Sequence, residues 1–141
     1  MSSLRAVPAF LLALAAATAG AEPDLSAPEA FSAVREGRIR LIDIRTPQEW
    51  RQTGVPAGSG RVDFYRGADV LLKSVLDMVG GDRDAPIALI CRTGNRTTQA
   101  QKFLQSQGFT RVYNVREGMA GSNAGPGWLN RRLPVDACAQ C

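Results

Sequence analysis

The sequence has 141 residues with 17 basic and 13 acidic side chains, which gives a formal net charge of +4. It contains no histidine, and this excludes imidazole bases and histidine-ligated metal sites. Basic residues are interspersed with acidic ones and only Arg131 and Arg132 are adjacent, so the charge predicts a solvated surface and no nucleic-acid interface.

The first 21 residues have the pattern of a secretory signal peptide. Arg5 supplies a positive charge, residues 6–19 are almost all apolar, and Ala19-Gly20-Ala21 is a small-x-small cleavage site. The run is too short and too rich in alanine for a membrane span, which needs about 20 strongly apolar residues. We expect cleavage before Glu22, a periplasmic or secreted protein, and no membrane contact after cleavage.

The rest of the chain alternates apolar runs with helical patterns, which is typical of an α/β domain. Residues 22–135 are predicted to form this domain, and residues 136–141 a C-terminal tail. Helices are expected over 26–36, 49–52, 69–79, 97–107 and briefly around Trp128, and strands over 39–44, 62–64, 86–91 and 111–115. The run 86–91 is the most apolar and therefore predicts a central strand. Thr46, Pro47 and Glu49 have the spacing of a capping box.

The sequence contains three cysteines, Cys91, Cys138 and Cys141. An odd number in an exported chain indicates one pair and one free thiol. Cys138 and Cys141 lie together in the segment CAQC and form the natural pair, so Cys91 is left unpaired. An unpaired cysteine in an oxidising compartment needs a use.

Cys91 ends the apolar run and precedes a loop and a helix. Ligands of parallel sheets bind beyond the carboxyl ends of strands, and a helix N-terminus favours anions. A thiol at this position loses its proton more easily, Arg92 and Arg96 add positive charge, and Gly94 lets the loop curl. The alternative is an inert buried cysteine before an ordinary turn. Position, arginines and compartment together favour an activated thiolate in an anion-binding loop.

Four motifs follow one another in the order found in a known family. They are LIDIRTPQEW, the G-x-P-x-G segment Gly54–Gly58, CRTGNRT and VREGMAG. With these motifs the sequence resembles the single-domain rhodaneses, of an exported bacterial type, from about Pro28 to Val135. The resemblance implies an α/β fold with a five-stranded, mainly parallel sheet flanked by helices. Many members have His-Ile-Pro-Gly-Ala in place of residues 54–58, so a role for that histidine is excluded here.

The resemblance also implies the chemistry of a sulfurtransferase. Cys91 would take a sulfane sulfur from a donor anion such as thiosulfate, hold it as a persulfide, and pass it to a thiol or cyanide-like acceptor. No cofactor and no metal is expected. The loop that would hold the persulfide and the donor consists of Arg92, Thr93, Gly94, Asn95, Arg96 and Thr97.

Other residues have weaker assignments. Asp43 and Arg45 are expected to be structural, because a carboxylate within an apolar strand needs a partner, with Arg45 as a secondary contributor to the site. Residues 117–121 are expected at the mouth of the site. Three interpretations of Cys138 and Cys141 remain open: a local disulfide, which we favour, a pair that resolves or relays the Cys91 persulfide, and a zinc site, which lacks ligands. A redox or sulfur-acceptor protein is a further expected partner.

Two other functions compete with sulfur transfer. Phosphatases and arsenate reductases related to the dual-specificity phosphatases have the spacing Cys-x5-Arg. Here Arg96 follows Cys91 with the spacing Cys-x4-Arg, and the position of the arginine in the longer spacing is occupied by Thr97. The shorter loop suits a single sulfur atom better than a tetrahedral oxyanion. A carrier or binding module without turnover ranks last, because inactive relatives usually lack the cysteine that this chain keeps.

Overall fold

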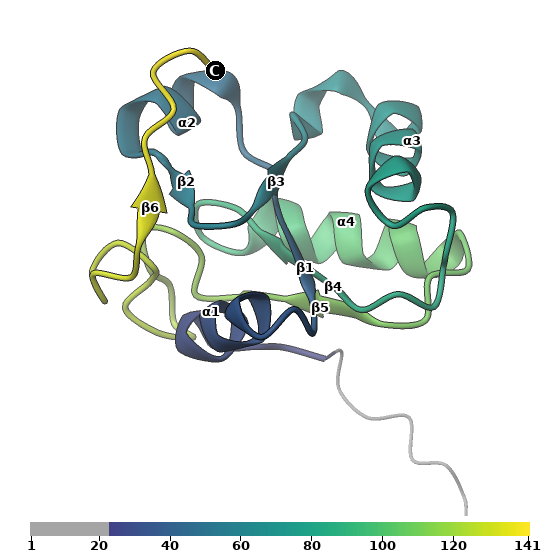
Figure 1. Ribbon diagram of the computed structural model, residues 1–141, viewed down its shortest axis with the longest axis horizontal. Helices are drawn as coiled ribbons and strands as arrows, with labels where there is room; N and C mark the ends of the chain where they lie inside the picture. The colour runs from purple at the N-terminus through teal and green to yellow at the C-terminus, as the bar shows by residue number, and fades with distance from the viewer. Residues whose placement is uncertain (1–22) are drawn as a thin grey trace, which may run out of the picture.

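The computed structural model describes residues 23–141, and the predicted signal peptide lies outside them (Figure 1). Within this range no helix has the length and apolar character to cross a membrane. The elements in chain order are α1 (Ala27–Arg35), β1 (Arg40–Asp43), α2 (Pro47–Thr53), β2 (Val55–Pro56), β3 (Gly60–Arg61), the 3-10 turn η1 (Phe64–Arg66), α3 (Ala68–Met78), β4 (Ile87–Ile90), α4 (Asn95–Ser106), β5 (Val112–Asn114) and β6 (Val135–Asp136).

The central sheet is parallel, as predicted, with the strand order β3-β1-β4-β5. The central position expected for residues 86–91 is confirmed, because β4 lies between β1 and β5. In the described residues the sheet has four strands, where the resemblance implied five. Among residues 23–141, the pairing beyond β5 is the isolated parallel bridge of Asp24 with Asn114, and α1 begins three residues later at Ala27.

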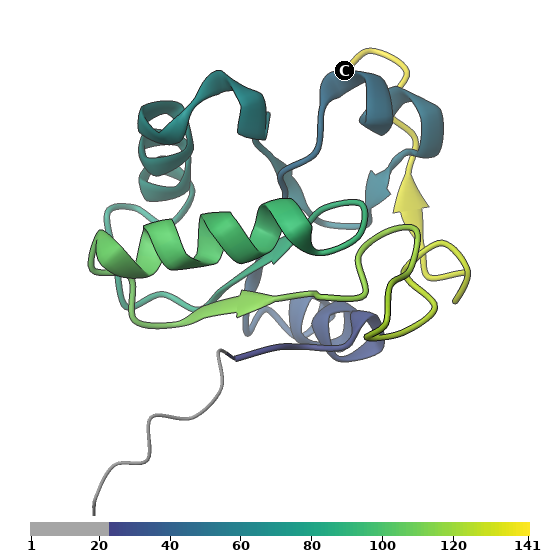
Figure 2. The ribbon, with the colours of Figure 1, turned by 180° about the vertical axis from the view of Figure 1, so that it is seen from behind.

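Helices cover both faces of this sheet, as the two opposite views show (Figures 1 and 2). Alternate residues of each strand point to opposite faces. Leu41, Ala88 and Ile90 pack with α1 and Trp128, while Ile42 and Leu89 pack with α3 and α4. Burial of each of these leucine and isoleucine side chains stabilises the fold by about 1.5–3 kcal/mol. Cys91 packs in the same cluster as Ile42 and Leu89 and so faces α3 and α4.

The predicted capping box of α2 is confirmed. The Thr46 hydroxyl accepts the Glu49 N–H at 3.3 Å, and the Glu49 carboxylate accepts the Thr46 N–H at 3.1 Å. Together these bonds satisfy two backbone donors that the first turn of a helix leaves open. The box therefore fixes where α2 begins and holds the Glu49 carboxylate at that point.

Several expected elements differ in the structure. The strand expected over 62–64 is the shorter β3, because only Gly60 and Arg61 pair with β1, and η1 follows. α4 begins at Asn95, earlier than expected, because Gly94 ends the loop in a left-handed conformation with φ +92°. Trp128 lies buried in a series of turns, where a helix was expected. β6 was not expected, and it pairs antiparallel with β2.

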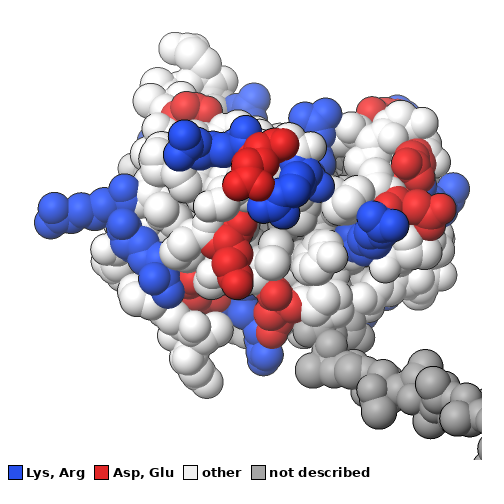
Figure 3. Space-filling model, turned by 60° about the horizontal axis from the view of Figure 1, so that its bottom comes forward, with Lys and Arg blue, Asp and Glu red and all other residues white. Residues whose placement is uncertain are grey.

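The charges are mixed on the face of the molecule drawn in Figure 3. Lysine and arginine side chains alternate there with aspartate and glutamate side chains. This arrangement agrees with the solvated surface predicted from the sequence.

Candidate functional site

Cys91 follows the last residue of β4, at the carboxyl end of the sheet. Its side chain is 1% exposed, and its sulfur forms no disulfide. Its backbone carbonyl accepts the Met119 N–H at 2.9 Å, and the neighbouring Ile90 carbonyl accepts the Ile44 N–H at 2.9 Å. The thiol is thus fixed between the strand β1 and the segment that follows β5.

The loop after Cys91 curls around its sulfur. The Gly94 N–H donates to Cys91 Sγ at 3.2 Å, and Thr97 Oγ1 lies 3.5 Å from the same sulfur. The hydroxyls of Thr97 and Thr98 donate to the Gly94 carbonyl at 3.0 and 2.7 Å, which closes the turn. Because α4 starts at Asn95, the sulfur lies at the positive end of a helix of 12 residues. This arrangement can stabilise negative charge on sulfur.

Two glycines allow the chain to pack this closely. A Cβ at Gly94 would overlap the carbonyl of Arg116, and a Cβ at Gly118 would overlap the carbonyl of Arg92. Both glycines have a positive φ, +92° and +69°. The VREGMAG segment therefore forms the support on which the loop rests, which explains why the two motifs occur together.

Glu117 holds this support from within the protein and does not line the mouth of the site. It is 1% exposed and accepts hydrogen bonds from the N–H groups of Ala27 and Gly127, both at 2.7 Å, and from Arg131 Nε at 2.8 Å. Burial by itself would raise the pKa of Glu117, but these donors, with Arg131 first, outweigh it and lower the pKa. The expectation that it lies at the mouth was wrong because its carboxylate joins three chain segments.

Arg96 is fixed by Glu49 of α2. Its two terminal nitrogens donate to the two carboxylate oxygens at 2.8 Å each, and its guanidinium lies 5.8 Å from the Tyr65 ring centre. The Arg96 hydrogen bonds lower the pKa of Glu49 to about 2. The pKa of Arg96 is raised, chiefly by Glu49 and to a smaller extent by the charge of Cys91. Arg92, in contrast, has an exposed side chain.

Arg45 forms an ion pair with Asp43, and both residues are buried. Its Nη2 donates to Asp43 at 2.7 Å and to the Gly54 carbonyl at 2.9 Å, and its Nη1 donates to the Thr53 hydroxyl at 2.9 Å. Its guanidinium thus joins β1 to the end of α2. These contacts agree with the structural role expected from the sequence.

An open cavity of about 280 Å³ borders the outer side of the loop. Its lining includes Thr93, Asn95, Thr98 and Arg116. Arg116 was not singled out in the sequence, because it follows β5 and reaches this place only through the pairing of β4 with β5. The cavity provides polar and positive groups beside the loop.

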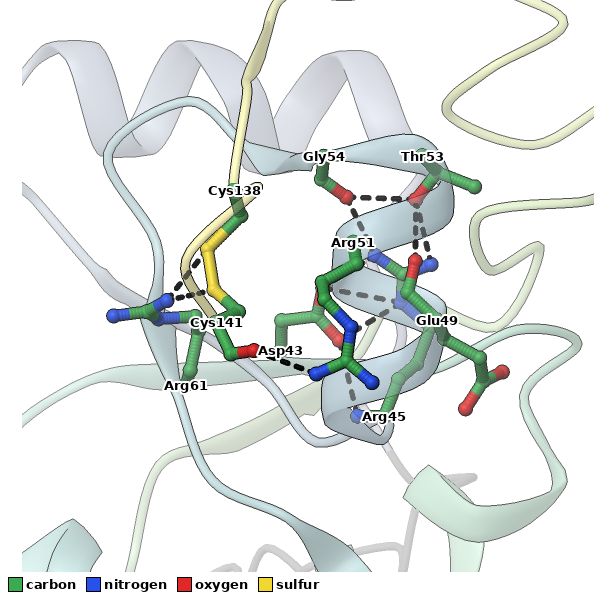
Figure 4. Close-up of a disulfide and its surroundings, with 9 residues drawn as sticks. All are labelled: Asp43, Arg45, Glu49, Arg51, Thr53, Gly54, Arg61, Cys138 and Cys141. Atoms are coloured by element: carbon green, nitrogen blue, oxygen red, sulfur yellow. Dashed lines mark hydrogen bonds and ion pairs between the residues drawn. A yellow bond between two sulfur atoms is a disulfide. The ribbon is translucent and has the colours of Figure 1, made fainter.

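Cys138 and Cys141 form a disulfide, as favoured from the sequence (Figure 4). Arg61 Nη1 contacts both sulfurs, and Arg51 Nη1 donates to the Cys141 carbonyl at 2.6 Å. Among residues 23–141 no group of three or more cysteine or acidic side chains is placed to hold a metal.

Comparisons with known proteins agree with this geometry. The model of the rhodanese-like domain family matches residues 26–124. An uncharacterised protein of Rickettsia prowazekii is 31% identical over 98 residues, 67% of this chain and 80% of the relative. The thiosulfate sulfurtransferase GlpE of Pseudomonas aeruginosa is 33% identical over 92 residues, 65% of this chain and 76% of the relative. The polysulfide-sulfur transferase homodimer of Wolinella succinogenes has a similar structure, with a TM-score of 0.63, 28% identity, and coverage of 84% of this chain and 81% of its own.

Proposed function

The chain belongs to the rhodanese-like domain family, and on this premise we propose that it is a sulfurtransferase that carries sulfur as a persulfide on Cys91. The observation that carries the proposal is the contact of the Gly94 N–H with Cys91 Sγ at the N-terminus of α4. A thiosulfate sulfurtransferase and a polysulfide-sulfur transferase among its relatives support the same reaction class.

The first half-reaction loads the cysteine. The Cys91 thiolate attacks the outer sulfur of a donor such as thiosulfate, a sulfur–sulfur bond forms, and sulfite leaves with the electron pair of the bond that breaks. The persulfide anion then occupies the place where the Gly94 N–H and the first N–H groups of α4 stabilise negative charge. In the second half-reaction a nucleophilic acceptor removes the outer sulfur and frees the thiolate.

The contacts of Arg96 argue against a phosphatase. In that chemistry an arginine of the loop would bind the tetrahedral oxyanion through two donors. Both terminal nitrogens of Arg96 already donate to Glu49 at 2.8 Å. Arg96 therefore acts better as a fixed positive charge beside the sulfur than as a ligand for a phosphate or arsenate.

We also propose that the protein works in the periplasm or outside the cell, as its first 21 residues predict. A free thiol there is exposed to oxidants, and the burial of Cys91 at 1% exposure limits their access. The physiological donor would then be a sulfur anion of that compartment.

The test is to treat the protein, with its Cys138–Cys141 disulfide intact, with thiosulfate and to measure its intact mass. We expect a gain of one sulfur atom, and release of thiocyanate when cyanide follows. The Cys91→Ser variant should gain nothing, whereas the Cys138→Ser/Cys141→Ser variant, which keeps Cys91 as its one thiol, should still gain sulfur there, as peptide mapping would locate. Hydrolysis of an aryl phosphate without any mass gain would contradict sulfur transfer and support the phosphatase alternative.

A further inference from the structure

The CAQC segment, residues 138–141, is held at the same edge of the sheet as Cys91. Its sulfurs contact Arg61, which is the last residue of β3 (Figure 4). The strand register aligns Arg61 with Asp43 of β1, and Asp43 with Ile90, the residue before Cys91. Adjacent strands lie about 4.8 Å apart, so the backbones of Arg61 and Ile90 are separated by roughly 10 Å.

Two elements, α2 and η1, each contact the Cys91 loop through one residue and the surroundings of the disulfide through the next residue. In α2, Glu49 binds Arg96 of the loop, while the next residue, Trp50, lies 5.7 Å below the guanidinium of Arg61. In η1, Tyr65 lies against Arg96, while the next residue borders the disulfide cavity described below. The two sulfur-bearing sites therefore border the same two elements, α2 and η1.

A cavity of about 360 Å³ opens beside the disulfide on this side of the sheet. Cys141 lines it together with Arg61, Arg66 and Trp50, and the side chains of the lining carry two positive charges against the one negative charge of Asp63. The indole N–H of Trp50 is buried and has no acceptor within residues 23–141. Val62 lines the cavity and also packs in the cluster that contains Cys91. The cavity thus offers the positive charges of Arg61 and Arg66 to an anionic sulfur.

The CAQC segment has the reach to cross this short gap once its disulfide opens. β6 holds Val135 and Asp136 on β2, and the five residues that follow can extend about 17 Å from that point. Of the two cysteines, Cys141 lines the cavity. We propose that the reduced Cys138–Cys141 pair is the built-in acceptor for the sulfur on Cys91, and that this sulfur leaves as hydrogen sulfide. This inference rests on the proposed function.

The transfer proceeds in two exchange steps. The Cys141 thiolate attacks the outer sulfur of the Cys91 persulfide, so a sulfur–sulfur bond forms on Cys141 while the Cys91 thiolate leaves with the electron pair. Cys138 then attacks the inner sulfur of the Cys141 persulfide, which closes the disulfide and expels sulfide. The two thiols are oxidised, the sulfane sulfur is reduced, and their two protons leave with it as hydrogen sulfide. An external dithiol must reopen the disulfide before the next cycle.

The experiment compares the reduced and the disulfide forms of the protein. Protein is reduced with a dithiol, freed of it without air, and given thiosulfate at a fixed, saturating concentration. We expect the wild type to release one sulfide per chain and to lose the thiols of Cys138 and Cys141, with a rate constant that does not change when the protein is diluted at that thiosulfate concentration. The Cys138→Ser/Cys141→Ser variant should release none and keep the sulfur on Cys91. The Ala139→Ser variant, which places a hydroxyl in the same segment and keeps both thiols, should behave as the wild type.

Three outcomes would overturn this inference. A reduced wild type that keeps a stable Cys91 persulfide without sulfide release excludes the pair as acceptor, while sulfur transfer itself stands. Equal sulfide release from the double variant would also exclude the pair as acceptor. A first-order rate constant that increases with protein concentration would exclude transfer within one chain. If the disulfide form gains no sulfur at all, the proposed function fails and this inference fails with it.

Discussion

Glu49 and Arg96 form a two-fold hydrogen-bonded ion pair that ties α2 to the start of α4, with both bonds at 2.8 Å. The residues lie 47 positions apart in the chain, and their side chains are 20% and 16% exposed. The same Glu49 carboxylate also accepts the Thr46 N–H of the capping box. One side chain therefore sets both the start of a helix and the position of a loop charge.

We predict that Glu49→Gln slows sulfur loading of Cys91 without abolishing it. In glutamine an NH2 group, which can only donate, replaces one of the two carboxylate oxygens that accept from Arg96. One Arg96 hydrogen bond is therefore lost, and the guanidinium is no longer held beside the loop. The check is the rate at which the protein gains mass, measured at several thiosulfate concentrations so that kcat and KM are obtained separately. We expect kcat/KM to fall about tenfold, and Glu49→Asp, which keeps the charge, to restore part of it. An unchanged rate would show that Arg96 needs no partner.

The same pair should make stability depend on acidity. The folded pKa of Glu49, about 2, lies below its ordinary value of 4.5, so its contribution is complete above pH 4.5 and is lost as the pH falls toward about 2. Urea unfolding should therefore show Glu49→Gln less stable than wild type by about 1–3 kcal/mol at pH 7, and the gap should close between those two pH values. Asp77→Asn breaks the exposed Lys73–Asp77 pair and should change stability by less than about 1 kcal/mol throughout.

Gly94→Ala should remove loading and destabilise the fold. Its φ of +92° is one that alanine rarely adopts, and the added methyl would overlap the Arg116 carbonyl. We expect the free energy of unfolding to fall by about 3 kcal/mol, as measured by unfolding in urea. Gly80→Ala is the matched control, because Gly80 also has a positive φ, +62°, but has open space around it and should cost only about 1 kcal/mol. Equal losses would mean that conformation matters at Gly94 and the close approach does not.

Local features of the sequence predicted most of the fold. The α2 capping box needs only Thr46, Pro47 and Glu49, and the run 86–91 predicts a buried strand by its composition alone. Cys91 could be placed at the site because the end of a strand and the start of a helix are both visible in neighbouring residues. The loop after it begins its helix earlier than expected, since the positive φ of Gly94 is a property of the packed chain.

Contacts between distant residues could not be predicted in this way. Arg96 was expected to act on the sulfur, but its main partner is Glu49, whose role in the capping box gave no sign of a second contact. β6 has only two residues, too few for an alternating pattern, and pairs with a strand that is equally short. Arg61 lies 77 residues from Cys138, so its contact with the sulfurs follows only from the fold. Long-range pairs of this kind determine what the site can do.

Export is a separate prediction. Full-length chain expressed in a Gram-negative bacterium should be recovered from the periplasm or medium, with Glu22 as its first residue, because Ala19 and Ala21 fit the small pockets of a signal peptidase. The check is cell fractionation with N-terminal mass analysis. Ala21→Leu should block cleavage and leave the longer chain attached to the membrane fraction. Recovery of the intact chain from the cytoplasm would contradict export.

Arg61→Gln should slow the passage of sulfur to the CAQC segment. The Arg61 guanidinium contacts both sulfurs, and a positive charge there stabilises the Cys141 thiolate that must attack. A charge-assisted hydrogen bond of about 1.5–3 kcal/mol corresponds to a loss of roughly ten-fold or more in the rate of sulfide release. The measurement is sulfide release from reduced protein after loading, with Lys102→Gln as the control that removes an exposed charge from α4. A rate as fast as wild type would exclude Arg61 from the transfer, and a partial return with Arg61→Lys would show that charge is what matters.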